Sequence, residues 1–294
     1  MSLIILGICL PWLGAWFKQY VTEAVFLLLV TAFLRIDEDR LKHHVSRPTM
    51  AILATIWSAF VIPILSGTIC LTLGLNDSSS ELFLALILQS SASPMMATPA
   101  LVALLGLDST LVLVSMIACT ALIPITAPLF ISVFADQAIP IAAWQLAGKL
   151  TAVLAGAAVS GLVLRRTLGL ACIQKHHDEI NGFNIVVLFV FVAAIMENVG
   201  ATIIENPWVS LRLLTVAFAV FFGLFVVTAA LFFRADRNQA ASLALMVSQR
   251  NMGLMIAATN GLLPELTWTY FAFAQIPIYL SPQLLKPIVN WIQK

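Results

Sequence analysis

Polar side chains interrupt the apolar run at residues 81–105, and their types are those that bind ligands through hydrogen bonds. Four hydroxyl or amide side chains surround two prolines: Gln89, Ser91, Ser93, Thr98, Pro94 and Pro99. Because proline lacks a backbone N–H and clashes with the preceding turn, we expect a kink or an unwound stretch here. Unwound backbone in an apolar environment needs polar partners or a cavity. The segment therefore predicts a ligand site, with a serine-stabilised kink as the alternative.

A second polar stretch lies in the run 238–262 and contains a central arginine. Arg250 lies twelve residues from each end of the run, at a depth where an arginine costs roughly 2.5–3.5 kcal/mol on membrane-insertion scales. No carboxylate has a comparable position, because Glu23 and Glu197 lie nearer the ends of their runs. We therefore expect a bound anion to supply the counter-charge. The alternative is that Arg250 donates to freed carbonyls of residues 81–105 and locks the two segments together.

The neighbours of these residues complete the predicted site. Gly253 permits local unwinding after Arg250, and Ser115 of the run 109–133 is assigned to the same cavity. The predicted substrate-binding residues are Arg250, Asn251, Gln249, Ser248, Gln89, Ser91, Ser93, Thr98 and Ser115. Pro94, Pro99 and Gly253 are predicted as structural breaks. We expect no catalytic residue, no metal ligand and no cofactor, since the chain lacks the motifs of soluble enzymes.

The composition indicates a protein that is embedded in a membrane. Hydrophobic residues make up 61% of the 294 residues and charged residues 10%, and the mean hydropathy is +1.01. In soluble proteins hydrophobic residues make up about 45–50% and charged residues about 25%. One spanning helix needs ~20 apolar residues, and the chain holds ten apolar runs: 2–17, 20–36, 48–74, 81–105, 109–133, 140–164, 182–203, 207–233, 238–262 and 264–290. We expect an all-α polytopic protein with ten helices in a single transmembrane domain over residues 1–294.

Basic residues are distributed unevenly over the connectors between these runs. The connectors after the second, sixth and eighth runs hold nine: Arg35, Arg40, Lys42, Arg47, Arg165, Arg166, Lys175, Arg234 and Arg237. The opposite connectors hold only Lys18 and Arg212. The positive-inside rule then predicts that both termini are cytoplasmic, in a plasma (inner) membrane. A net charge of +1 gives no field that would attract nucleic acid.

The ten runs divide into two halves of five, about 1–136 and about 137–294. An odd number of helices per half inverts one half relative to the other, as in many carriers. The two polar runs, 81–105 and 238–262, are both fourth in their half. Interrupted helices at matching positions of two halves indicate the binding site of a transporter.

Several motifs resemble the bile acid:sodium symporter family. The stretch Leu34–Leu41 with Arg47-Pro48 resembles the loop after the family's second helix, and Arg250–Leu254 is similar to the Gln-Asn-x-Gly-Leu stretch of its ninth helix. The resemblance implies two inverted five-helix repeats, with helices four and nine broken where they cross. It also implies a panel of helices 1, 2, 6 and 7 and a core of helices 3, 4, 5, 8, 9 and 10. Members of the family carry organic anions, usually with sodium.

The residues that serve sodium in that family are replaced in this chain. Aligned on Pro94, the family's Pro-Gly-Gly-x-x-Ser-Asn pattern reads Met95 and Met96 for the glycines, then Pro99 and Ala100 for Ser-Asn. An acidic position of the ninth helix reads Met246, its sodium-binding glutamine reads Arg250, and a glutamine of the third helix reads Ser58. The sequence therefore does not predict sodium coupling of the family's usual kind.

The leading hypothesis is a secondary transporter of a small organic anion of carboxylate type. Arg250 would supply permanently the positive charge that bound sodium supplies in relatives. A sodium-coupled symporter that uses other ligands, and a membrane subunit or sensor that transports nothing, are the alternatives. A membrane enzyme acting on lipid would need clustered acids or a nucleophile–base pair, which the chain lacks. The expected partners are the lipid bilayer and the anion, with a proton or sodium ion left open, and the oligomeric state is not predicted.

Overall fold

The computed structural model describes residues 2–34, 48–135, 142–259 and 261–292, and these residues form helices with no β-strand. The all-α expectation is thereby confirmed for the described part of the chain. The first half contains α1 (Ser2–Cys9), α2 (Pro11–Phe17), α3 (Val21–Leu34), α5 (Pro48–Ile56), α6 (Ile62–Thr72), α7 (Leu75–Ser78), α8 (Ser80–Ser91), α9 (Thr98–Leu104) and α10 (Ser109–Phe134). The second contains α11 (Ala143–Leu168), α12 (Leu170–Lys175), α13 (His177–Ile195), α14 (Val199–Glu205), α15 (Pro207–Phe232), α16 (Arg237–Ser248), α17 (Met252–Ala258) and α18 (Glu265–Ile292).

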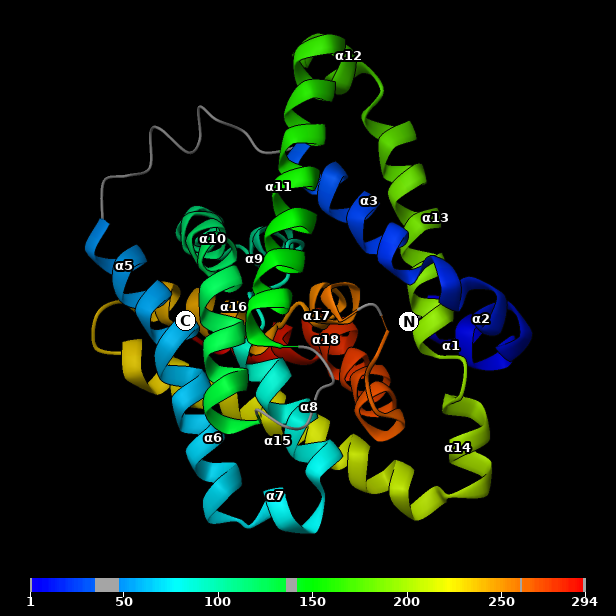
Figure 1. Ribbon diagram of the computed structural model, residues 1–294. Coiled ribbons are helices and arrows are strands. Elements are labelled where there is room, and N and C mark those ends of the chain that lie inside the picture. The colour runs from blue at the N-terminus through cyan, green and yellow to red at the C-terminus, as the bar shows by residue number, and fades with distance from the viewer. Residues whose placement is uncertain (1, 35–47, 136–141, 260, 293–294) are drawn as a thin grey trace.

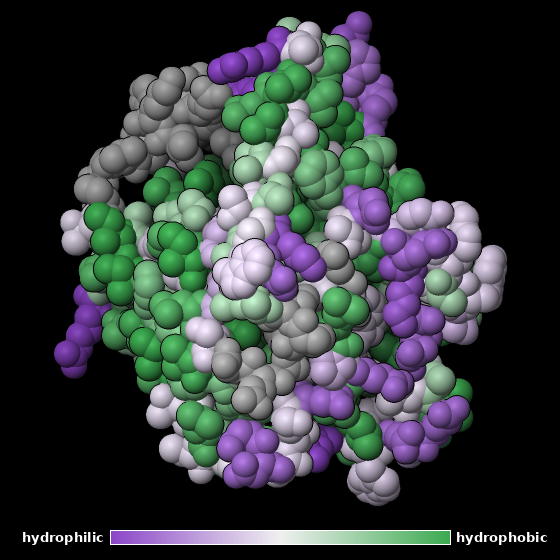
Figure 2. Space-filling view, viewed as in Figure 1, coloured by the Kyte–Doolittle hydropathy of each residue, from purple (hydrophilic) through white to green (hydrophobic). Residues whose placement is uncertain are grey.

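Six helices in the described residues are long and apolar enough to cross a membrane, so the chain is a multi-pass membrane protein. They are Pro11–Leu34, Thr49–Thr72, Ser109–Phe134, Ala143–Leu168, His177–Glu205 and Pro207–Phe232. The flanks of the bundle are apolar as well. Figure 2 shows hydrophobic side chains gathered over α5 and α6, where Ile52, Ile56 and Ile69 are exposed. Such a surface is solvated by lipid.

The predicted count of ten spanning helices is not confirmed, and the clearest departure is at the N-terminal end. The expected helix 2–17 is interrupted at Leu10, because Pro11 has no N–H to continue α1 and instead occupies the first turn of α2. The expected gap before residue 20 is absent. Residues Lys18–Tyr20 form a tight helical turn that joins α2 directly to α3, since no proline or glycine breaks the chain there.

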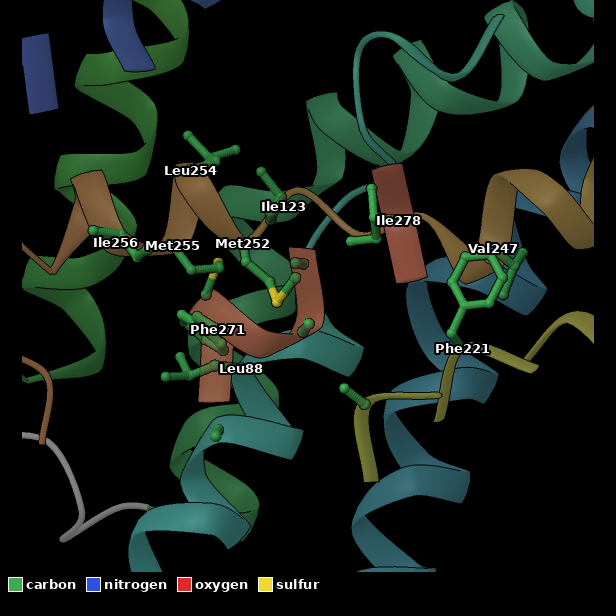
Figure 3. Packing of buried hydrophobic residues seen from close by; sticks show 14 of the residues in the cluster. Leu88, Ile123, Phe221, Val247, Met252, Leu254, Met255, Ile256, Phe271 and Ile278 are labelled. Carbon is green, nitrogen blue, oxygen red and sulfur yellow. The ribbon is translucent and has the colours of Figure 1, made fainter. Parts of the chain in front are cut away.

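The long helices are arranged around two broken segments. Figure 1 shows α11 and α13 as a tall hairpin joined by α12, with α3 passing between them and α1 and α2 beside α13. The pieces α8, α9, α16 and α17 lie near the centre of the molecule. Their apolar side chains form the interior, in which Leu88 of α8, Met252 of α17 and Phe271 of α18 meet (Figure 3). All three are fully buried.

Close contact between α3 and α11 depends on a glycine. A Cβ on Gly161 would lie 2.8 Å from Phe33 Cβ and 3.1 Å from the Val30 carbonyl oxygen. Gly148 of the same helix is exposed and has no atom within 4 Å of its Cβ position. Small residues of this kind let two helices approach closely in a membrane.

Replacing Gly161 by alanine should therefore destabilise the protein, whereas the same change at Gly148 should not. Overpacking costs about 1–3 kcal/mol, while alanine in place of an exposed helical glycine gains up to about 1 kcal/mol. Thermal unfolding of the purified protein in detergent measures both. A midpoint for Gly161→Ala equal to that of Gly148→Ala would show that α3 and α11 are not packed as described.

Candidate functional site

The first broken segment separates α8 from α9 at residues 92–97. Pro94 lies inside the break, and Pro99 lies in the first turn of α9, where a missing N–H costs nothing. The second broken segment, residues 249–251, separates α16 from α17. Gly253 lies outside this break, in α17, where a Cβ would come within 2.8 Å of the Phe191 ring. Its role in the structure is close packing against α13, whereas the sequence predicted local unwinding.

The two breaks cross, and each supplies hydrogen-bond partners to the other. The backbone N–H of Asn251 donates to the Ser93 carbonyl at 2.8 Å, and that of Met95 donates to the Gln249 carbonyl at 2.9 Å. Pro94 and Arg250 thereby form an isolated antiparallel bridge. In an apolar interior an unsatisfied backbone group costs several kcal/mol, so each break depends on the other.

The Arg250 side chain is buried at this crossing, with 2% of its surface exposed. Its Nη1 donates to the Ala92 carbonyl at 2.9 Å and contacts the Ser58 hydroxyl at 3.2 Å and the Ser58 carbonyl at 3.3 Å. The predicted locking of the two segments is therefore present on one nitrogen. Within the described residues, Nε and Nη2 have no hydrogen-bond partner, and no carboxylate forms an ion pair with the guanidinium.

Three of the other predicted polar residues connect segments around the crossing: Gln249, Thr98 and Gln89. Gln249 donates to the Ser281 hydroxyl at 2.6 Å and approaches Thr98 at 3.5 Å. Gln89 accepts a 2.6 Å hydrogen bond from the Tyr270 hydroxyl. The Ser248 hydroxyl donates to a carbonyl of its own helix at 3.0 Å. The hydroxyl oxygens of three further predicted residues are buried without a partner in the described structure: Ser91, Ser93 and Ser115.

A cavity of about 480 Å³ lies on the side of the crossing that faces α3 and α13. Of the nine predicted binding residues, Arg250 and Asn251 line it, together with Pro99 and Gly253. The other seven do not: Gln89, Ser91, Ser93, Thr98, Ser115, Ser248 and Gln249. The volume is within the usual range of small-molecule sites, about 300–1,000 Å³. A ligand of this cavity would thus touch the crossing without entering the packed interior behind it.

Sequence reasoning missed the opposite wall of the cavity. Thr31 of α3 and Asn184 of α13 both line it, and the Thr31 hydroxyl lies 2.8 Å from the Asn184 side-chain oxygen. Tyr279 of α18 lines it too, and its buried hydroxyl has no partner among the described residues. Each of these is a single polar residue in an apolar run. That is the signal that could have found them, because an isolated polar group in a membrane helix tends to face a cavity or a partner.

The crossing does not suit a bound cation. A sodium ion takes several oxygen ligands, preferably with a carboxylate among them, and the Ala92 and Ser58 oxygens here already receive the Arg250 guanidinium. A second positive charge beside a buried guanidinium would be repelled in a low dielectric. In the described residues no group of three or more His, Cys, Asp or Glu side chains is placed to hold a metal.

The hydrogen bond between Tyr270 and Gln89 should be important for stability, because it joins α18 to the end of α8 just before the break. Tyr270→Phe removes the donor and leaves the buried Gln89 oxygen unsatisfied, at a cost of about 1–3 kcal/mol. Tyr20→Phe is the control, since Tyr20 is exposed. The measurement is thermal unfolding in detergent, and equal midpoints for the two variants would contradict the assigned bond.

Comparison with known protein families agrees with this architecture. The family model of the sodium bile acid symporter family matches residues 22–206, well over half of the chain. A search of curated proteins found no match. The matched range contains nearly all of α3, the first broken segment and the α11–α13 hairpin, whereas Arg250 and the rest of the second broken segment lie outside it. The resemblance seen in the sequence is confirmed: the chain belongs to the sodium bile acid symporter family, whose members are membrane transporters.

Proposed function

We propose that this protein is a secondary transporter of a small organic anion, which it binds through Arg250 in the cavity between the crossing and the α3–α13 wall. The observation that carries the proposal is the unpaired edge of the guanidinium. Nε and Nη2 are adjacent, and together they form the edge that binds a carboxylate through two parallel hydrogen bonds. Nη1, by contrast, is engaged by Ala92 and Ser58. Nε and Nη2 are both buried without a hydrogen-bond partner in the described structure, so an anion in the cavity would reach this edge once the groups that cover it move aside.

Charge supports an anion over a neutral substrate. Arg250 is buried without an acidic partner in the described residues, and an uncompensated buried charge is costly. A carboxylate would neutralise it. Among the described residues no other Lys or Arg lines the cavity, so one carboxylate per substrate matches the site. The apolar lining, which includes Met95, Met96 and Leu188, would contact the rest of the molecule.

Because the crossing does not suit sodium, we propose transport that is not coupled to sodium in the way usual for the family. The permanent charge of Arg250 would attract the anion in place of a bound ion. Transport would follow a gradient, an exchange or a proton. A sodium-coupled symporter that uses other ligands is the competing possibility.

The architecture proposed for transport has two bodies. One, the panel, would contain α1, α2, α3, α11, α13 and α14, and the other, the core, would contain the two crossing segments and the remaining helices. The cavity lies between them. Counted with the broken segments as single elements, the chain would comprise ten elements in two inverted repeats, about 1–136 and about 137–294. Alternating access would then be movement of one body against the other, in the inner membrane with both termini cytoplasmic.

The test begins with substrate identification on the whole purified protein. A thermal-shift screen of small carboxylates, each with and without sodium, selects the compound that stabilises most, since binding to the native state raises the melting temperature. The selected compound is then assayed for uptake into proteoliposomes. Uptake that does not require sodium supports the proposal, whereas uptake that rises steeply with external sodium supports the competing symporter.

Substitutions of Arg250 separate its charge from its role in holding the crossing. Arg250→Gln removes the charge and the bidentate edge, so uptake should fall at least tenfold. Because the glutamine side chain is two bonds shorter, thermal unfolding of the same variant shows how much the crossing loses when the bond from Nη1 to Ala92 is removed. Arg250→Lys keeps the charge without the bidentate edge and should lie between wild type and Arg250→Gln. Wild-type uptake by Arg250→Gln would mean that Arg250 only holds the crossing. A well-folded protein that binds no carboxylate in the screen would favour a membrane subunit or sensor.

A further inference from the structure

A cluster of three side chains lies at the end of the protein opposite the basic connectors. The Lys18 ammonium forms a 2.6 Å ion pair with the Glu197 carboxylate. The same ammonium lies over the Trp268 ring, 5.4 Å from its centre. Lys18 lies between α2 and α3 and Glu197 follows α13, whereas Trp268 is near the start of α18. The ion pair is therefore made within the proposed panel, and the contact with the ring joins panel to core.

Tight packing fixes the position of this ammonium. One helical turn before Lys18, a Cβ on Gly14 would lie 2.6 Å from the Ala193 carbonyl oxygen and 2.9 Å from the Glu197 Cα. The absence of a side chain at Gly14 thus lets α2 lie directly against the end of α13. Lys18, four residues on, is on the same face of its helix and meets Glu197.

The cavity lies towards the ends of α3 and α13 that are far from Lys18 and Glu197. Thr31 lines it three residues before the end of α3, which leads into the basic segment 35–47. Asn184 lines it seven residues after α13 begins, just beyond the basic connector that contains Arg165 and Lys175. Lys18 and Glu197 lie at the opposite ends of α3 and α13.

One stripe of α3 connects the cluster to the cavity. Lys18, Val21 and Val25 follow each other at spacings of three and four, so they lie along one face. Val25 lines the cavity, and Val21, between it and Lys18, is 3% exposed. Trp268 is buried at 8%. Buried side chains therefore separate the cavity from this end of the protein, and the half-exposed Lys18 lies beyond them.

We propose that Lys18, held by Glu197 and placed on Trp268, is the gate that closes the cavity at the end opposite the basic connectors. The proposal rests on the proposed function, because it assigns one of the two closures that alternating access needs. A half-exposed ion pair and one cation–π contact are weak interactions. Weakness suits a gate, since two states that interconvert during transport must be close in free energy.

The experiment measures access without any substrate. In the full-length protein with the two more accessible native cysteines removed by Cys9→Ser and Cys172→Ser, Val21→Cys reports on the closed route and Thr110→Cys reports on the cavity near the basic end. A membrane-impermeant maleimide is reacted with each in proteoliposomes or in detergent. The same background without an added cysteine gives the baseline for the buried Cys70 and Cys119.

Weakening the gate should shift the protein towards the state that is open at this end. With Lys18→Met or Trp268→Leu, we expect labelling of Val21→Cys to rise about two- to fivefold, as loss of one weak contact allows, and labelling of Thr110→Cys to fall. Lys286→Met, which changes an exposed lysine near the far end of α18, is the matched control and should change neither rate.

Three outcomes would overturn the gate. These are unchanged labelling of Val21→Cys in both variants, a rise at both reporter sites, which indicates general loosening, or the same response to Lys286→Met. The labelling result does not depend on the substrate. Reciprocal labelling combined with failed carboxylate uptake would therefore support the gate and contradict the organic-anion proposal, so the two can be judged separately.

Discussion

Backbone that leaves helical geometry inside an apolar protein must find hydrogen-bond partners elsewhere, and this constraint organises the centre of the molecule. Neither broken segment could satisfy its own groups. They do so together, through the bonds from Asn251 to Ser93 and from Met95 to Gln249. Arg250 then donates to the Ala92 carbonyl, which α8 leaves free at its end. The crossing therefore joins the two halves of the chain at the centre of the molecule, and the cavity lies beside it.

The division of the guanidinium between two tasks explains why an arginine is tolerated at this depth. A purely structural donor need carry no charge, because a neutral N–H group can satisfy a carbonyl at lower desolvation cost. A purely ligand-binding cation would not need to contact Ser58. The Arg250 side chain makes the structural hydrogen bond with Nη1 and leaves Nε and Nη2 without a partner in the described structure. In the proposed function a bound anion would offset its burial cost, so affinity would depend on charge.

The sequence predicted what local chemistry decides. Pro94 and the polar residues around it indicated the first break, and Arg250 marked the second. The sequence could not predict which side of the crossing contains the cavity. In a helix that is apolar on all faces, the pattern of residues does not reveal which face lines a cavity. Thr31 and Asn184 were missed for that reason, and Gln89 was assigned to a ligand although Tyr270 already binds it. The continuous helix through Lys18 was missed because a polar residue alone does not end a helix.

A fixed cation also changes what the conformational equilibrium can depend on. A ligand shifts two states only by the difference in its affinity for them. In a carrier whose binding site is positive only while a cation is bound, that cation contributes to the difference in affinity between the two states. In the transporter proposed here the charge of Arg250 would be present in both states, so the anion itself would have to provide the whole difference through the groups it contacts in each. Contacts between the proposed panel and core that involve no substrate, such as Lys18 on Trp268, would then set the resting balance, and they would have to be weak enough for one small anion to overcome them.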